Sequence, residues 1–315
     1  MQAHTDIYNL PKFRNAAITI GTFDGVHTGH LKIIEQLKKE AILNNGESVI
    51  ITFDPHPRMV VGNAGQNTTN PIFLLNTLEE KKELLANQGI DHLVIVPFTK
   101  EFSELSAEDY IHHFLVETFR PATIIIGYDH HFGKERGGNY KLLEKYAGEL
   151  NYTVKEIPQY ILEDITISST KIRDAIKDGD VNASHLYLGY DYYFSGEVVN
   201  GDKIGRTLGY PTANLKIDDD FKLIPGNGIY IVEAEHENKR LQGMMSIGFR
   251  PTVGGTKRTI EVNLFDFNEE IYGVTIKVIL KKYIRKELKF EDLNGLILQM
   301  KEDEKRAKQF FENQP

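Results

Sequence analysis

Residues 17–30 of the chain read AITIGTFDGVHTGH, and this stretch decides the fold of the first half. It opens with apolar and β-branched residues, which predict a buried strand. A turn that contains Gly21 and Gly25 follows, and from Leu31 onward apolar residues recur at helical spacing. We therefore expect a strand, a tight glycine-containing turn and a helix, in that order.

The alternation of strand and helix continues through the first half. Apolar or β-rich runs predict further strands over residues 48–53, 92–98, 122–127 and 152–157. Capping signatures at Thr77 and Ser106 begin two of the expected helices, of which the first would end at Gly89. Strands separated by helices are typical of a doubly wound parallel sheet, an α/β fold that binds ligands at the carboxyl ends of its strands.

The second half has a different pattern of predicted secondary structure, which begins after about Gly179. Short β-type runs between turn signals predict strands over residues 194–199, 229–234, 244–247, 259–267 and 275–280. Residues 291–311 then turn helical. We expect an all-β domain, a small antiparallel β-barrel with a C-terminal helix, and we place the two domains at 1–183 and 184–315.

The composition limits the classes of function. The 315 residues are 41% hydrophobic and 26% charged, and the net charge of −8 argues against general nucleic-acid binding through clustered basic residues. The chain has no cysteine, which excludes disulfides, zinc–thiolate sites and cysteine nucleophiles. Residues 1–12 lack the apolar core of a signal peptide, and no apolar run is long enough to cross a bilayer. We expect a cytoplasmic protein with no membrane partner.

The first candidate site is the turn at residues 21–30. Its small residues let backbone amides approach a ligand closely, and the start of the following helix favours anionic phosphate. His27 and His30 would place imidazoles against phosphate oxygens and stabilise charge that develops during transfer. Two plainer interpretations stay open. In the first, the histidines cap the helix. In the second, they form half of a metal site with other histidines, namely His56, His130 and His131.

A second motif, ISSTKIR, lies at residues 167–173. Hydroxyl residues at the start of a helix are ordinary N-caps, which is the plain interpretation of this motif. The functional interpretation is that Ser169, Thr170 and Arg173 face the same phosphates as the two histidines. The guanidinium of Arg173 would then grip a phosphate about one turn into the helix.

The second half carries its own motifs. Residues 205–215 read GRTLGYPTANL, which is either a hairpin connection or a ligand loop, and no Gly-Lys-Ser/Thr follows to make it a Walker A loop. Thr212 and Asn214 are two apart on a strand and so share a face, and both offer the oxygen ligands that Mg²⁺ prefers. Glu261 alternates with apolar strand residues, so it is either a solvent-facing position or a general base.

Together these motifs resemble the bacterial bifunctional riboflavin kinase/FAD synthetase family. The adenylyltransferase half resembles the family at the turn of residues 21–30, at TFDPHP (52–57), at GYDHHFG (127–133) and at ISSTKIR. The kinase half resembles it at GYPTAN (209–214), IGFRPTV (247–253) and EVNLFDF (261–267). The motifs occur in the family's order, and the resemblance spans the chain from about Ala17 to Ala307.

The resemblance implies two ATP-dependent reactions, phosphorylation of riboflavin to FMN and adenylylation of FMN to FAD with release of pyrophosphate. In the second reaction, His27 and His30 would stabilise the departing phosphates without a covalent intermediate. The implied nucleotide and phosphate contacts are Gly21, Phe23, Asp24, Gly25, Asp129, Ser169, Thr170, Arg173, Gly205, Arg206 and Gly209.

For the kinase, the resemblance implies that Thr212 and Asn214 bind Mg²⁺ with ATP. Glu261 would be the base that acts on the ribityl 5′-hydroxyl. The implied flavin contacts are Arg250, Arg285 and Glu287. The chain departs from the family at two places: the family often has Phe-Arg where this chain has His130-His131, and commonly His where it has Asn263. The roles of these residues are left open.

Three rival functions remain in view. The histidines suggest a metal-dependent hydrolase, which would leave Thr212, Asn214 and Glu261 unexplained. A different adenylyl- or cytidylyltransferase would share the turn at His27 but not the barrel motifs. A flavin-binding protein without activity would not need both sets of polar groups. We expect riboflavin, FMN and ATP as the partners, with no nucleic acid.

Overall fold

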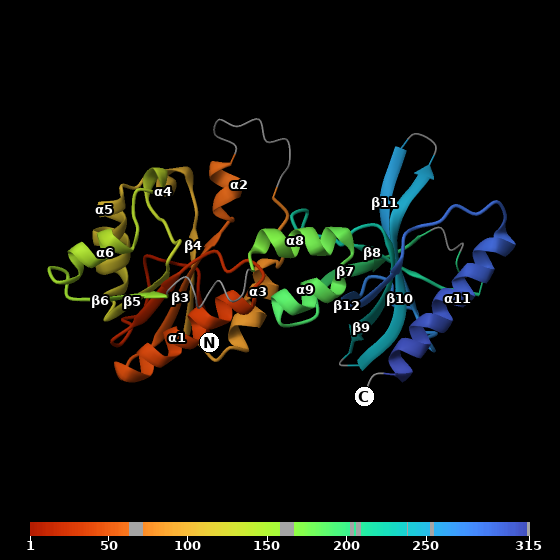
Figure 1. The fold of residues 1–315 in the computed structure, drawn as a ribbon, viewed down its shortest axis with the longest axis horizontal. Helices are drawn as coiled ribbons and strands as arrows, with labels where there is room; N and C mark the ends of the chain where they lie inside the picture. Colours follow the sequence, from red (N-terminus) through yellow and green to blue (C-terminus); the bar gives the residue numbers. More distant parts are fainter. Residues whose placement is uncertain are drawn as a thin grey trace. The chain divides into compact units, whose positions relative to one another are not determined.

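The computed structural model describes residues 1–62, 72–157, 167–201, 205, 209–237, 239–252 and 255–313, without the side chains of residues 250–257. By its internal contacts the chain divides into two compact units, Met1–Ser169 and Thr170–Pro315 (Figure 1). Each unit has its own architecture, as predicted from the change along the sequence from alternating strands and helices to short β-type runs.

The first unit is built on a parallel sheet of six strands in the order β1-β4-β3-β2-β5-β6. The strands are β1 (Gln2–His4), β2 (Ala17–Ile20), β3 (Ser48–Asp54), β4 (His92–Pro97), β5 (Thr123–Gly127) and β6 (Thr153–Ile157). The four predicted strands after β2 are confirmed, whereas β1 was not predicted. The order runs outward from β2 in both directions, which makes β2 and β5 the point at which the direction of winding switches.

Helices cover both faces of this sheet (Figure 1). Those of the first unit are α1 (Thr28–Leu43), α2 (Pro57–Val61), α3 (Leu78–Ala86), α4 (Lys100–Ser103), α5 (Ala107–Asp109), the π-helix η1 (Tyr110–Glu117), the 3₁₀-helix η2 (Lys134–Arg136) and α6 (Tyr140–Ala147). Successive strand residues bury on opposite faces. Ile18 packs with residues of η1 and α6, and Ala17 packs with residues of α1 and α3. Burial on both faces explains the continuous apolar strands, and the doubly wound fold is confirmed.

The second unit contains a closed antiparallel barrel of six strands in the order β10-β11-β8-β7-β12-β9. Its strands are β7 (Tyr193–Val199), β8 (Ala213–Lys216), β9 (Gly228–His236), β10 (Lys239–Thr252), β11 (Gly255–Leu264) and β12 (Thr275–Arg285). The helix α11 (Leu293–Glu312) follows, as predicted. Strands β10 and β11 form a ribbon that is longer than the sequence pattern predicts (Figure 1).

Two helices precede the barrel. Helix α8 (Ser169–Asp178) begins within the ISSTKIR motif, where we expected a helix to start, whereas α9 (Val181–Leu188) occupies the stretch in which we placed the domain boundary. The side chain of Asp180 accepts a hydrogen bond from Ala183 N over 2.9 Å, and Gly189 ends α9 at φ 80°. The expected boundary between residues 183 and 184 falls inside α9, and the extent of each functional domain stays a prediction. Across the described ranges, no helix is long and apolar enough to span a membrane.

Candidate active sites

The two histidines of the first motif lie together where α1 begins. His27 is the N-cap of α1, and its Nδ1 accepts a hydrogen bond from the backbone N–H of His30 over 3.4 Å. The two rings are stacked, with centroids 3.7 Å apart and an interplanar angle of 16°. His27 therefore does cap the helix, while the stack holds both imidazoles at the carboxyl end of β2.

The glycines of this turn allow its shape. Gly25 has φ 90°, a region that favours glycine. A Cβ on Gly29 would lie 3.2 Å from the His27 ring, so a larger residue there would push against the stack. The turn thus brings backbone and imidazoles into a small space, as a phosphate site requires.

Burial lowers the pKa of His30 well below its ordinary value, and the electrostatic effects of the neighbouring His27 and of Lys81 lower it further. His30 is therefore neutral at physiological pH. Within the part of the chain that the structure describes, its Nδ1 is buried without a hydrogen-bond partner. Buried polar atoms are rarely left in this state, so the atom is a candidate contact for a ligand.

Phe23 and Asp24 have structural contacts in this turn. The ring of Phe23 is buried, and its centroid lies 5.0 Å from that of His30. Asp24 is 2% exposed, and its carboxylate accepts a hydrogen bond from Leu75 N over 2.9 Å. Its carbonyl accepts one from the hydroxyl of Ser169 over 3.0 Å. These contacts join three separate segments around the turn.

The other predicted residues of this site are described to different extents. Asp129 is exposed, and its carbonyl accepts a hydrogen bond from Nδ1 of His131 over 2.9 Å. Arg173 is 7% exposed on α8, where Thr170 is exposed. Thr170 and Arg173 belong to the second compact unit, so their alignment with His27 stays a prediction.

Among the residues that the structure describes, the histidines of the first unit form no metal site. His56 caps α2, with its Nδ1 accepting from Arg58 N over 3.1 Å. Burial lowers the pKa of His130 to about 4. In the described ranges, no three His, Cys, Asp or Glu side chains lie together as metal ligands would. The arrangement thus gives the hydrolase interpretation no set of ligands among these residues.

In the barrel, Thr212 and Glu261 are in contact. The hydroxyl of Thr212 donates a hydrogen bond to Oε2 of Glu261 over 3.2 Å. Asn214 on β8 is paired in register with Glu261 on β11. Glu261 is half-buried between buried neighbours, so it is not a fully solvated position. A carboxylate beside two neutral oxygen donors can bind a cation or accept a proton.

The segment before β8 is held at several points. The amide of Asn263 donates a hydrogen bond to the carbonyl of Pro211 over 2.7 Å. Tyr210 N donates to the carbonyl of Gly205 over 2.8 Å. The hydroxyl of Tyr210 donates to Glu304 of α11 over 2.9 Å, and burial together with this carboxylate raises the pKa of Tyr210 to about 12. Gly209 has φ 84°, which only glycine adopts readily.

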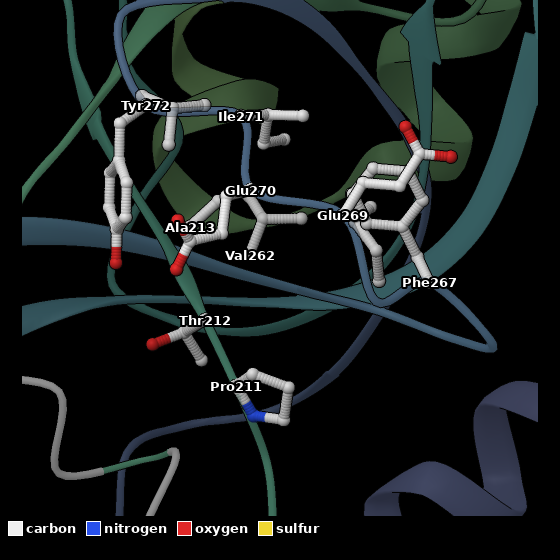
Figure 2. A pocket seen from close by; sticks show the side chains of 11 residues that line it. Pro211, Thr212, Ala213, Val262, Phe267, Glu269, Glu270, Ile271 and Tyr272 are labelled. Atoms are coloured by element: carbon white, nitrogen blue, oxygen red, sulfur yellow. The ribbon is translucent and has the colours of Figure 1, made fainter.

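A cavity of about 60 Å³ opens beside Thr212 (Figure 2). Besides apolar residues of β7, β8 and β11, its lining includes Glu269, Glu270 and Tyr272. These three residues follow β11 in a stretch that our sequence analysis did not single out. In the sequence they are an acidic pair followed, after Ile271, by a tyrosine. This pattern is typical of an exposed turn and does not indicate a site.

Two of the predicted flavin contacts, Arg285 and Glu287, have other neighbours in the structure, and the side chain of the third, Arg250, is not described. The guanidinium of Arg285 donates to both carboxylate oxygens of Asp303, with Nη2 2.6 Å from Oδ2. The carboxylate of Glu287 occupies the space that a side chain at Gly248 would take. The side chain of Arg250 lies outside the described part of the chain, and so does Arg206, which is a predicted nucleotide contact. The flavin roles of Arg250, Arg285 and Glu287 and the nucleotide role of Arg206 stay predictions.

In comparisons with known proteins, two family models match separate parts of the chain. The family model for FAD synthetase matches residues 10–171, and the model for riboflavin kinase matches residues 188–311. A bifunctional riboflavin kinase/FMN adenylyltransferase of Listeria monocytogenes is 37% identical over 299 residues, covering 94% of this chain and 93% of the relative. The protein of the same name from Escherichia coli K12 is 35% identical over 308 residues, covering 97% and 96%.

A solved structure that resembles this chain over almost its whole length offers a further comparison. It comes from Streptococcus pneumoniae, is described as a macrolide-efflux protein, and shares 29% sequence identity with a TM-score of 0.85. The match covers 98% of both chains. Its description differs from the activities named for the curated relatives, so it supports the fold, whereas the family models and the relatives identify the activities.

Proposed function

This chain belongs to the family of bifunctional riboflavin kinase/FMN adenylyltransferases, and we propose how its residues carry out the two reactions. The chain is an enzyme of flavin biosynthesis that makes FMN from riboflavin and FAD from FMN. The parallel-sheet part matches the FAD synthetase family and the barrel matches the riboflavin kinase family. The roles of individual residues are our assignment.

We assign the kinase reaction to the barrel. The observation that carries this assignment is the hydrogen bond between Thr212 and Glu261, with Asn214 paired opposite Glu261. Thr212 and Asn214 offer the oxygen ligands that suit Mg²⁺ bound to ATP. When bound, this ion would neutralise charge on the phosphates. Glu261 would accept the proton of the ribityl 5′-hydroxyl, which then attacks the terminal phosphate.

We assign adenylyl transfer to the turn at His27. The phosphate of FMN would attack the α-phosphate of ATP, and pyrophosphate would leave. The backbone of the turn and the N-terminus of α1 would bind the phosphates, and His27 and His30 would donate hydrogen bonds to oxygens that gain charge. The unpartnered Nδ1 of His30 supports such a contact. The reaction needs positioning and charge stabilisation but no nucleophile from the enzyme.

The partners in this proposal are riboflavin, FMN and ATP with Mg²⁺. The net charge of −8 gives no support to a nucleic-acid partner. We place the enzyme in the cytoplasm, without a membrane partner.

The experiment is a time course of the purified chain with riboflavin, excess ATP and Mg²⁺, resolved by chromatography. FMN should appear first and FAD after it. Glu261→Gln should abolish FMN formation and leave adenylylation of supplied FMN intact, because the amide cannot accept the proton. His27→Ala should do the reverse.

The outcomes separate the alternatives. FMN without FAD in the unsubstituted chain would contradict the assignment at His27. Equal loss of both activities in both variants would contradict the division into two sites. Flavin binding without ATP turnover would favour the non-catalytic alternative, and stoichiometric bound zinc with hydrolysis would favour the hydrolase.

A further inference from the structure

A buried lysine lies behind the turn that we assign to adenylyl transfer. Lys81 on α3 is 7% exposed, and its Nζ donates a hydrogen bond to the carbonyl oxygen of Thr22 over 2.8 Å. The hydroxyl of Thr52 donates to the same oxygen over 3.1 Å. Two side chains from different elements thus hold one carbonyl, which belongs to the second residue after β2.

The backbone that follows this carbonyl is strained. Phe23 has φ 47° and Val26 has φ 38°, and neither is a glycine. Non-glycine residues persist in this region only when their surroundings fix them. The hydrogen bonds to Thr22 fix the chain immediately before Phe23, so they help to impose the path that leads to His27.

The charges around Lys81 link it to the two histidines. Burial lowers the pKa of Lys81, while the carboxylates of Asp24 and Asp54 raise it. A buried ammonium is stable only beside such partners. His30 is stacked on His27, and the electrostatic effects of His27 and Lys81 lower its pKa in addition to burial. Lys81 therefore acts on the turn through a hydrogen bond and on His30 through its charge.

We propose that Lys81 is a positioning residue for adenylyl transfer: its ammonium holds the carbonyl of Thr22, and its charge acts on His30. This inference rests on the proposed role of the turn at His27. Lys81 would touch neither substrate. Its contribution is to keep the turn in the conformation that receives the phosphates, and its charge adds to the effect of burial in lowering the pKa of His30.

The experiment compares three variants of the full chain. Lys81→Met removes both the hydrogen bond and the charge, and Lys81→Gln removes the charge but keeps an N–H donor one bond nearer the backbone. Lys82→Met is the matched control, because Lys82 is the next residue on α3 and pairs instead with Glu79 over 2.7 Å. Each variant is assayed for adenylylation of supplied FMN from pH 5 to 9 and for riboflavin kinase activity.

Lys81→Met should lower kcat for adenylylation about 10- to 100-fold, as expected for a misplaced site. Lys81→Gln should recover most of this loss. Because both variants lack the charge that helps to lower the pKa of His30, the acid limb of the adenylylation profile should move to higher pH in both. Lys82→Met should match the unsubstituted chain, and kinase activity should be unchanged throughout.

His27→Ala, measured in parallel, separates the two claims. If it abolishes adenylylation while Lys81→Met leaves the rate and the pH profile unchanged, the inference about Lys81 is wrong and the proposed function stands. If the unsubstituted chain or His27→Ala contradicts the role of the turn, both claims are wrong. Should Lys81→Met not fold, Lys81→Gln decides through its pH profile, and an unshifted acid limb would overturn the inference.

Discussion

At the scale of the residue, Asn263 shows how a departure from the family pattern fits this chain. Its amide donates to the carbonyl of Pro211, next to the proposed Mg²⁺ ligand Thr212. Asn263 is 6% exposed, and loss of its amide would remove this hydrogen bond. A hydrogen bond of this kind contributes about 0.5–1.5 kcal/mol.

We therefore expect Asn263→Ala to raise the KM for ATP in the kinase reaction up to about tenfold, in line with this contribution. Asn263→His, which places the common family residue there, should retain a ring N–H donor and keep the KM within about threefold of normal. Steady-state kinetics at fixed Mg²⁺ would measure both, with adenylylation of FMN as the internal control. An unchanged KM in Asn263→Ala would show that the amide does not position Thr212.

The lowered pKa of His130 leads to a prediction about how the free energy of unfolding depends on pH. Burial lowers its pKa to about 4, whereas an unfolded histidine titrates near its ordinary value of 6.5. Between these values the unfolded chain binds a proton that the folded chain does not, so the free energy of unfolding should fall as the pH drops below 6.5. From pH 7.5 to pH 5 we expect a loss of about 1–2 kcal/mol from this residue.

Urea unfolding at the two pH values would measure this loss. His130→Phe should remove it, because phenylalanine does not titrate. His131→Phe is the matched control, since His131 is the exposed neighbour in the same loop. Equal acid sensitivity in His130→Phe and the unsubstituted chain would rule out the buried imidazole as its source.

The sequence could predict some functional residues and not others for a physical reason. The turn at His27 is local, so its residues are adjacent in both sequence and space. The contact between Thr212 and Glu261 depends on the pairing of β8 with β11, which no local pattern specifies. Lys81 resembles a solvated helix residue in sequence, and only the packing of α3 behind the turn buries it.

At the scale of the element, α11 is tied to the kinase segment. Tyr210 donates its hydroxyl to Glu304, and its ring packs with Met244 and Ala307. Tyr210→Phe should keep the ring packing but lose one hydrogen bond, which is worth about 1 kcal/mol. We expect a rise of about threefold in the kinase KM for ATP, since Tyr210 precedes the Pro211-Thr212 segment.

The measurement is again kinase kinetics, and Glu304→Gln provides a second test. The glutamine can still accept from the tyrosine, so its kinase KM should stay closer to normal than that of Tyr210→Phe. If Tyr210→Phe leaves the KM unchanged, α11 does not help to position this segment.

Prediction of elements succeeded where the signals were local. The capping box of Thr77 and Glu80 begins α3 as predicted, although α3 ends at Ala86 rather than at Gly89. We did not predict α9 because it is only 8 residues long and because its N-cap, Asp180, is a residue type that is also common in connecting segments. The π-helix η1 has no sequence signature of its own, because its apolar residues also fit an α-helix.

At the scale of the whole molecule, the two units have separate cores, so each should respond to its own substitutions. Asp303 pairs with Arg285 and is 2% exposed. Asp303→Asn would leave the guanidinium without its counter-charge, at a cost of about 3 kcal/mol. Kinase activity should then be lost at a lower urea concentration, by about 1 M, while the midpoint for adenylylation stays unchanged.

Glu302→Gln is the matched control on the same helix. Glu302 pairs with Arg306, and both side chains are about half exposed, at 48% and 52%. An exposed pair contributes at most about 1 kcal/mol, so neither midpoint should move noticeably. A shift of both activities in Asp303→Asn would show that the two units unfold as one.

The division into two architectures could be predicted from the sequence because the spacing of apolar residues changes near Gly179. The strand orders could not be predicted in the same way. They place β2 beside β5 and β8 beside β11, and these pairings join segments far apart in the chain. Such contacts depend on the packing of the whole unit.

The joining of both units in one polypeptide has a consequence for the cell. Every translated copy supplies one kinase and one adenylyltransferase, so gene expression cannot change their ratio. The steady-state balance between FMN and FAD must therefore be set by turnover numbers, by substrate supply and by the proteins that withdraw each product.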